Sequence, residues 1–426
     1  MMLLSIHFCC PRILMLCVVC LLHQTSLEPS LHGGAMQLSH LLVEAEAPTR
    51  ASLWPCTGAS EVALEEGQVL VRVAKFVFTA NTLTYALAGR LEPLRYFDHF
   101  PVPEGVPERQ RYGRGPCWGT GIVAESRCPE VAVGTRLFGL LAMSPFVVLT
   151  PTAARPTDFV DAAPHRAGLL PAYKTYYTAA SPAYKGLSPD EEDFQLASGG
   201  LFGTGWAMSQ SAVLGPEAPT AMLLTSASSR TAYGAAFAAK FHESGLRVVG
   251  LTSGKNLAFT RSLGVYDAVC AYEDVASLER QKVAVFDLTG DMSLLQAIYA
   301  HFREAVVSCG LVGGTHVGAF QASPAGFRRL GGASPTPFLV FTAMRALGEA
   351  RGQQEVARRL REATAAFKAR MLPSFRPLRR FGGEETLAVF EDMAHGRVPP
   401  DATYVCSLWP WGQDEPAPAP APKSRL

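Results

Sequence analysis

Apolar and polar positions in the second half of the chain follow a pattern of alternating strands and helices. From Ala221 onward, short runs that are apolar throughout alternate with longer helix-like runs, and the short runs are AMLLTS, LRVVGLTS, VAVFDLTG and AVVSCGLVGG. Strands that are apolar on both faces are typical of a parallel sheet with helices packed on each side. The pattern therefore predicts a doubly wound α/β domain.

A different pattern occupies about residues 44–151. Short runs rich in β-branched residues are separated by Gly and Pro, as in GQVLVRVAKFVFTA, GTGIVAES and VGTRLFGLL. This spacing is typical of a compact, mostly antiparallel β-barrel. The loop LRYFDHFPVPEGVPERQRYGRGPCWG is long, polar and rich in aromatic residues. Long loops inside compact domains are commonly functional.

The chain after about residue 332 contains an amphipathic segment and one last strand. GEARGQQEVARRLREATAAFKARM has helical spacing and many basic residues, which we interpret as a solvated face, and ATYVCSLW has the pattern of a strand. The final residues, GQDEPAPAPAPKSRL, alternate Pro and Ala. We expect this tail to stay extended and disordered.

A serine-rich turn separates the first apolar run of the α/β part from its helix. In a dinucleotide-binding unit this turn and the first amides of the helix hold the pyrophosphate, and small residues let the backbone approach it. The slots that usually carry glycine hold Ser226, Ser229 and Ala232. Such a turn also fits an α/β core without a cofactor. The residues that we expect to bind the cofactor here are Ser226, Ser228, Ser229, Arg230 and Thr231.

The end of the second strand indicates which cofactor the turn suits. An acid about 20 residues after the turn binds the ribose of NAD, whereas a basic residue accommodates the 2′-phosphate of NADP. Here the strand LRVVGL ends in a segment that holds Ser253 and Lys255 and no acid. The pair favours NADP, with a solvated lysine in a surface turn as the alternative. The missing acid disfavours a methyltransferase.

Composition narrows the range of partners. Of 426 residues, 38 are basic and 37 are acidic, which leaves no strong field for nucleic acid or an acidic membrane surface. No nucleophile elbow, Ser-His-Asp arrangement or P-loop is present, so hydrolase and kinase activities are disfavoured. The composition favours a small-molecule substrate over a nucleic acid.

The cysteines give no sign of a metal site or a disulfide framework. Four of the ten lie in the first 20 residues, and the other six are Cys56, Cys117, Cys128, Cys270, Cys309 and Cys406. These six include no CxxC pair and no His at ligand spacing, which argues against structural zinc. We expect no metal.

The first 35 residues have the pattern of a targeting leader. Arg12 precedes the ten-residue apolar run from Ile13 to Leu22. That run is shorter than the roughly 20 residues that span a membrane, but it suits a signal peptide. The alternative is a mis-assigned start, because Met36 opens a plausible mature domain. Secretion, an organelle and the cytoplasm stay open, and we expect no membrane attachment once the leader is removed.

Two groups of motifs carry a family resemblance. GTGIVAES followed by VAVGTRLFGLL is similar to stretches of the medium-chain dehydrogenase/reductase superfamily on its zinc-free, quinone-reductase-like side. The matching positions are Gly119, Gly121, Val133, Gly134, Arg136 and Gly139, with Thr135 in place of the usual Asp. KFVFTANTLTYALAG, SLGVYD and GGTHVG resemble the family known as domain of unknown function 2855. The likeness covers most of residues 36–411.

The resemblance implies a GroES-like β-barrel domain interrupted by a doubly wound Rossmann domain, with the cofactor between them and usually a homodimer. The expected division is a leader (1–35), the first barrel part (36–170), the Rossmann domain (171–330), a return to the barrel with a C-terminal helix (331–411) and the tail (412–426). The zinc-binding cysteines of the superfamily have no counterparts here.

Hydride transfer without zinc needs a side chain or backbone donor for the oxygen that gains charge. Asn81 matches the cleft Asn of zinc-free reductases by position, and Tyr85 lies four residues later, on the same face of a helix that begins there. Tyr96 is an alternative proton donor. His316 follows a strand that borders the nicotinamide in the superfamily, and Lys174, Tyr176 and Tyr177 are weaker candidates. A buried structural role is the alternative for each tyrosine and for His316.

These residues favour a zinc-independent, NADPH-dependent oxidoreductase that reduces an activated carbonyl, enone or quinone. The alternative is a non-catalytic protein that senses a nucleotide or binds a partner on a reductase scaffold.

Overall fold

The computed structural model describes residues 38–56, 62–92, 94–214, 217–313 and 331–409. The expected leader, the C-terminal tail and His316 lie outside the described residues. In the described part of the chain, no helix is both long enough and apolar enough to cross a membrane.

The first structural part, which we call the barrel part, is built from two sheets of mostly antiparallel strands. One has the order β2-β1-β4, and the other has the order β17-β18-β3-β5-β6-β10-β9-β8, with β7 paired to β3. Their bounds are β1 (Ser39–Glu44), β2 (Ala51–Pro55), β3 (Val69–Phe78), β4 (Tyr112–Gly113), β5 (Pro116–Ser126), β6 (Arg136–Ala142), β7 (Phe146–Leu149), β8 (Pro151–Arg155), β9 (Asp158–Asp161), β10 (Thr175–Thr178), β17 (Pro377–Phe381) and β18 (Thr403–Ser407). Strand β18, from near the end of the chain, pairs with β3 near its beginning.

The barrel part also carries short helices that connect or flank its strands. They are α2 (Ala80–Leu87), α3 (Tyr96–His99), α4 (Pro171–Lys174) and α11 (Gly382–Ala394). Buried residues of β3, β5 and β6 form the main core, together with aromatic residues of α2 and α3. Helices α2 to α4 therefore lie against the core and hold their aromatic side chains in fixed positions.

The second structural part is a parallel sheet with the order β13-β12-β11-β14-β15-β16. Numbered along the chain, this is the order 3-2-1-4-5-6 of a dinucleotide-binding fold. Its strands are β11 (Ala221–Leu224), β12 (Arg247–Thr252), β13 (Ala268–Ala271), β14 (Val283–Asp287), β15 (Val306–Leu311) and β16 (Thr336–Pro337), and its crossover helices are α6 (Arg230–Phe241), α7 (Leu257–Ser262) and α8 (Met292–Phe302). The doubly wound sheet predicted from Ala221 onward is confirmed.

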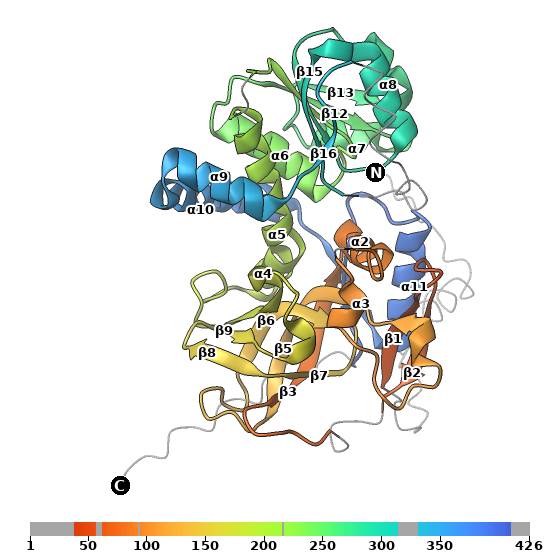
Figure 1. Cartoon of the computed structure of the whole chain (residues 1–426), viewed down its shortest axis with the longest axis vertical. Coiled ribbons are helices and arrows are strands. Elements are labelled where there is room, and N and C mark those ends of the chain that lie inside the picture. Colours follow the sequence, from red (N-terminus) through yellow and green to blue (C-terminus); the bar gives the residue numbers. More distant parts are fainter. Residues whose placement is uncertain (1–37, 57–61, 93, 215–216, 314–330, 410–426) are drawn as a thin grey trace, which may run out of the picture. The chain divides into compact units, whose positions relative to one another are not determined.

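Helices α9 (Val340–Arg351) and α10 (Gln353–Met371) lie side by side (Figure 1). Leu347 and Phe367 belong to the same core cluster as residues of α6 and β11, so both helices pack on the Rossmann sheet's helical layer. Strand β17 then begins the return to the barrel part. The expected division of the chain into domains stays a prediction.

Helix α5 (Pro189–Ala212) links the two parts. Ser188 caps it by accepting a hydrogen bond from the amide of Glu191, and Glu192 and Asp193 form ion pairs with the barrel part. Lys75 Nζ lies 2.8 Å from Glu192 and also contacts Asp193, which is fully buried. Because burying an unpaired charge is costly, these pairs fix where α5 leaves the barrel.

Candidate functional site

The serine-rich turn lies between β11 and α6, at the carboxyl end of the first parallel strand. Ser226 has a left-handed backbone with φ of 49°, a conformation that glycine adopts at lower cost. Ser229 caps α6, and its hydroxyl accepts a hydrogen bond from the amide of Ala232 at 3.4 Å. The turn thus holds a glycine-like conformation at Ser226, and one of the first helix amides is already paired with a side chain.

The ends of β11 and β12 are joined by a hydrogen bond from Asn256 Nδ2 to Ser228 Oγ, at 3.2 Å. Ser253 precedes the short 3-10 helix Gly254–Asn256. Lys255 donates from Nζ to the carbonyl of Gly396 at 3.3 Å and is exposed. The structure therefore brings the two predicted cofactor-binding segments together, with Lys255 at their outer side.

Arg230 and Thr231 both contact other segments of the chain. The Arg230 guanidinium contacts the hydroxyl of Thr403 and the carbonyl of Ala402, next to β18 of the barrel part. Its Nε is buried and has no hydrogen-bond partner among the described residues. Thr231 is 9% exposed, and its carbonyl lies against Gly205 of α5. Arg230 therefore ties the start of α6 to the barrel part.

A buried polar network lies at the carboxyl ends of the neighbouring strands β11 and β14, and the sequence analysis did not find it. Asp287 accepts hydrogen bonds from the hydroxyls of Thr225 and Thr289, both at 2.7 Å, and from the amide of Gly290 at 3.1 Å. In this strand order, β11 and β14 flank the topological switch point, where open α/β sheets bind ligands. The acid and hydroxyl residues of the run VAVFDLTG were the available signal.

Asn81 and Tyr85 lie on one face of α2, as predicted. The Asn81 amide donates from Nδ2 to the Tyr85 hydroxyl at 2.6 Å, and the Trp118 indole donates to the same oxygen at 3.2 Å. Tyr85 is 2% exposed, whereas Asn81 and Trp118 are partly exposed. The phenol of Tyr85 therefore sits beneath Asn81 with its oxygen held by two donors.

Tyr96 and Tyr173 complete an aromatic group with Tyr85. The ring centroids lie 4.8 Å apart for Tyr85 and Tyr96, 6.1 Å for Tyr85 and Tyr173, and 6.2 Å for Tyr96 and Tyr173. Tyr96 is 4% exposed, while Tyr173, in α4, is partly exposed. We call Tyr85, Tyr96 and Tyr173 the tyrosine cluster. The sequence pointed to Tyr85 and Tyr96 but missed Tyr173.

The weaker candidates near α4 have other contacts. Tyr176 is fully buried, and its hydroxyl donates to the carbonyl of Leu140 at 2.8 Å. Lys174 donates to the carbonyl of Ala167 at 3.4 Å, and the Tyr177 ring lies 6.0 Å from that of Tyr184. All three side chains belong to the local packing of β10 and α4, so none joins the tyrosine cluster.

Burial raises the pKa of all three clustered phenols, and for Tyr85 and Tyr96 neighbouring tyrosines raise it further. Interaction with Tyr173 raises the pKa values of Tyr85 and Tyr96, whereas interaction with Tyr96 and Tyr85 opposes the rise at Tyr173. All three groups stay protonated near neutral pH.

The tyrosine cluster also contacts the Rossmann part. The rings of Tyr173 and Phe341 lie 6.2 Å apart, and Phe341 follows the carboxyl end of β16. Because the carboxyl ends of parallel strands lie at one edge of the sheet, this contact puts the cluster at the edge where such sheets bind ligands.

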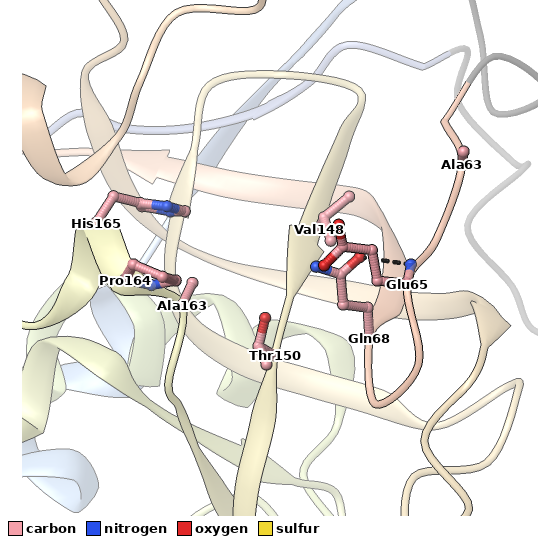
Figure 2. A pocket seen from close by; sticks show the side chains of 8 residues that line it. All are labelled: Ala63, Glu65, Gln68, Val148, Thr150, Ala163, Pro164 and His165. Carbon is pink, nitrogen blue, oxygen red and sulfur yellow. Dashed lines mark hydrogen bonds between the residues drawn. The ribbon is translucent and has the colours of Figure 1, made fainter.

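A pocket of about 350 Å³ lies elsewhere in the barrel part, with residues near β9 on one side and β7 and the residues before β3 around the rest. Figure 2 shows His165 on the opposite side of this pocket from Glu65 and Gln68. None of its lining residues belongs to the tyrosine cluster or to the serine-rich turn. Within the described ranges, no group of three or more His, Cys, Asp or Glu side chains is placed to hold a metal ion, and the expected zinc independence stays a prediction.

Comparison with solved structures shows the class of fold. CurA from Vibrio vulnificus in complex with NADPH is 12% identical, and the match covers 87% of this chain and 98% of that one with a TM-score of 0.55. A mycobacterial protein complexed with NADPH is 12% identical (87% and 99% covered, TM-score 0.50), and the enoyl reductase CurK is 16% identical (87% and 99% covered, TM-score 0.50). The fold is a GroES-like barrel interrupted by a Rossmann domain, as in medium-chain dehydrogenases/reductases.

The family model described as "Protein of unknown function (DUF2855)" matches residues 76–399. The chain belongs to this family, as its motifs predicted. No curated protein matches the sequence.

Proposed function

We propose that this protein is an NADPH-dependent reductase whose proton donor is the tyrosine cluster. The contact between Tyr173 and Phe341 carries the proposal, because it joins a set of protonated phenols to the ligand-binding edge of a dinucleotide-binding sheet. The NADPH complexes of CurA and of the mycobacterial protein, which share this fold, support the choice of cofactor.

The residues of the turn fit the phosphates of a dinucleotide. Ser226 adopts the left-handed backbone of a glycine, and the first amides of α6 have no partners within the helix apart from the one that Ser229 caps. A Cβ atom on Gly250 would lie 2.8 Å from Cβ of Ala227, so the turn sits directly against β12. The buried, unpartnered Nε of Arg230 adds a positive group at the start of α6. These residues would hold the pyrophosphate, and Ser253 and Lys255 the 2′-phosphate.

The order of acidity within the cluster selects the proton donor. The Tyr85 oxygen accepts hydrogen bonds from Asn81 and Trp118. Interaction with the other two phenols opposes the burial-driven rise in the pKa of Tyr173, whereas interaction with Tyr173 raises the pKa values of Tyr85 and Tyr96. Tyr173 is therefore the proposed general acid, and Tyr85 and Tyr96 act as positioning residues behind it.

The proposed substrate is an activated carbonyl, an enone or a quinone. NADPH supplies the hydride, and the oxygen of the acceptor gains negative charge that a donor must stabilise. The partly exposed Tyr173 and Asn81 offer neutral donors to such a molecule, and the rings of Tyr173 and Trp118 offer it flat apolar faces. Zinc independence and a homodimer are parts of this proposal.

A specific observation favours the second candidate, a non-catalytic nucleotide binder. Tyr85 and Tyr96 are 2% and 4% exposed, and the Ser229 hydroxyl accepts a hydrogen bond from one of the first helix amides. A scaffold whose phenols are buried and whose serine-rich turn has one amide paired internally would bind a nucleotide without catalysing its oxidation.

The test is titration of the purified full chain with NADPH and with NADH, followed by cofactor fluorescence and calorimetry. We expect saturable binding that prefers NADPH, followed by oxidation of bound NADPH when a panel of enones and quinones is added. Binding without oxidation across the panel supports the second candidate. Absence of binding of either nucleotide contradicts both.

A further inference from the structure

One buried arginine, Arg166, and one partly buried arginine, Arg114, lie in the barrel part, away from the tyrosine cluster and the turn. Arg166, in the 3-10 helix after β9, is 3% exposed. Its guanidinium carbon lies 3.9 Å from the ring centroid of Phe100. Among the described residues its Nε and Nη1 have no hydrogen-bond partner. Buried guanidinium N–H groups without acceptors are rare, because each costs desolvation free energy.

The carboxylate of Asp161 lies beside Arg166 but forms no hydrogen bond with its guanidinium. Asp161 is fully buried, and its Oδ1 accepts hydrogen bonds from the amides of Thr150 at 2.9 Å and Ala163 at 3.1 Å. Its Oδ2 lies 3.4 Å from Nε of Arg166, but no donor in the described residues hydrogen-bonds it. Backbone amides hold Asp161 in place, and its charge offsets one guanidinium.

A second guanidinium, that of Arg114, lies near enough to Arg166 for its pKa to be affected by the Arg166 charge. Arg114 precedes β5, donates from Nη1 to the hydroxyl of Ser144 at 3.3 Å, and has a buried Nε without a partner among the described residues. Burial and, after it, the charge of Arg166 lower the pKa of Arg114 to about 10. Arg114 therefore stays charged near neutral pH, facing a second positive charge.

The surrounding polar groups are uncharged. His40 Nδ1 lies 2.9 Å from Ser144 Oγ, and burial with the nearby Arg114 lowers the pKa of His40 to about 4. Burial and the charge of Arg166 lower the pKa of His165, and Arg114 adds to the shift. Among the described residues, Arg166 pairs with one carboxylate, that of Asp161, and Arg114 pairs with none. Two weakly acidic groups, the thiol of Cys56 and the phenol of Tyr176, also lie near Arg114.

We propose that Arg114 and Arg166 bind a small oxyanion, a carboxylate or a phosphate, in the barrel part. An oxyanion accepts several N–H donors at once and matches the planar fork of a guanidinium. It would accept hydrogen bonds from the three guanidinium nitrogens that have no hydrogen-bond partner among the described residues, and it would balance the excess positive charge. Ala163 and His165, which directly precede Arg166 in the chain, line the pocket in Figure 2. The site goes beyond the proposed reductase function and does not depend on it.

The test is calorimetric titration of the full-length protein with inorganic phosphate and with succinate, at ionic strength held constant with chloride. We expect saturable binding of at least one, and an Arg166→Gln variant that weakens it by about tenfold or more, as for loss of a charge-assisted contact. Arg109→Gln is the matched control, because Arg109 is an exposed arginine of the same part of the chain. Its affinity for the anion should not change.

Three further measurements locate the anion. Hydrogen exchange of the wild-type protein should show protection of residues 140–144 and 161–166 on addition of the anion, which needs no folded variant. If Lys255→Ala abolishes binding, or if protection is confined to residues 226–232, the anion lies in the serine-rich turn and the proposal is overturned. If Cys56→Ser leaves binding intact, the Cys56 thiolate is not the group that balances the charge of the arginines.

The two probes distinguish the sources of the oxyanion. Binding of phosphate points to a free inorganic anion or a phosphorylated ligand, and binding of succinate alone points to a carboxylate group of a substrate or effector. No saturable binding of either, with no protection at residues 161–166, overturns the site.

Discussion

The Tyr173 ring contacts the rings of Tyr85, Tyr96 and Phe341. Its role can be separated from theirs because each phenol can be removed without removing its ring. Tyr85 and Tyr96 support Tyr173 from the buried side, and only Tyr173 combines partial exposure with a contact to the Rossmann part. This asymmetry leads to the first prediction.

Tyr173→Phe should lower kcat by about 10²- to 10⁴-fold, the range for loss of a general acid, and leave the Kd for NADPH unchanged. Steady-state kinetics with an enone or quinone substrate and a parallel NADPH titration measure both quantities. Tyr177→Phe is the control, because Tyr177 lies in the neighbouring strand outside the cluster. If Tyr85→Phe abolishes turnover while Tyr173→Phe does not, the donor is Tyr85.

Lys255 is the second residue with a separable role. Lys255→Ala should weaken NADPH binding by about 1 to 3 kcal/mol through loss of a charge-assisted contact with the 2′-phosphate, and should leave NADH binding nearly unchanged. Calorimetry with both nucleotides measures the difference. Lys240→Ala, at an exposed lysine paired with Asp267, is the control. An equal loss for both nucleotides would contradict the assigned 2′-phosphate contact.

At the scale of elements, the close approach of α5 to α6 depends on one glycine. A Cβ atom on Gly205 would lie 2.4 Å from the carbonyl oxygen of Thr231 and 2.6 Å from the amide nitrogen of Ala235, both backbone atoms of α6. Neither helix can yield without moving as a whole. A Cβ atom on Gly203, two residues earlier in the same helix, would meet no neighbouring side chain or other element of the described chain within 4 Å.

Gly205→Ala should lower the free energy of unfolding by about 1 to 3 kcal/mol, the usual cost of overpacking, and displace the start of α6. Gly203→Ala should instead raise it by up to about 1 kcal/mol through helix propensity. Denaturant unfolding measures both changes, and NADPH affinity should fall only for Gly205→Ala. Equal stability of the two variants would show that the helices are not in close contact.

At the scale of the whole molecule, the buried imidazole of His40 and the partly buried imidazole of His242 couple stability to pH. Burial, followed by neighbouring arginines, lowers the pKa of His40 and of His242 to about 4, against 6.5 in an unfolded chain. Between those values the folded protein binds fewer protons than the unfolded one. Their contribution to stability is therefore complete above pH 6.5 and is lost as the pH falls toward 4.

The free energy of unfolding should fall as the pH is lowered from about 6.5 to 4.5. His40→Asn should be less stable at pH 7.5 and show a shallower fall, whereas His395→Asn, at an exposed histidine, should follow the wild-type curve. Chemical denaturation at a series of pH values measures this. A His40→Asn curve parallel to that of the wild type would mean that His40 is protonated in the folded protein.

Several features of the site could be predicted because they depend on residues close together in the sequence. The spacing of Asn81 and Tyr85 fixed their shared helical face, and the serine-rich turn followed from an apolar strand next to an alanine-rich helix. Tyr173 could not be found, because α4 is four residues long and its role arises from contacts with α2 and α3 far along the chain. The network around Asp287 likewise depends on β11 and β14 becoming neighbours.

The sequence by itself determined the elements and the fold, because hydrophobic periodicity and turn residues act over a few positions and the family motifs are local. It also determined the candidate cofactor-binding residues in the turns after β11 and β12. The tertiary structure decided which side chains meet. It placed Tyr173 beside two other phenols, turned Arg230 toward Thr403 and brought Arg114 near Arg166. The sequence could not show this, because burial and charge pairing depend on residues that only the folded chain brings within contact distance.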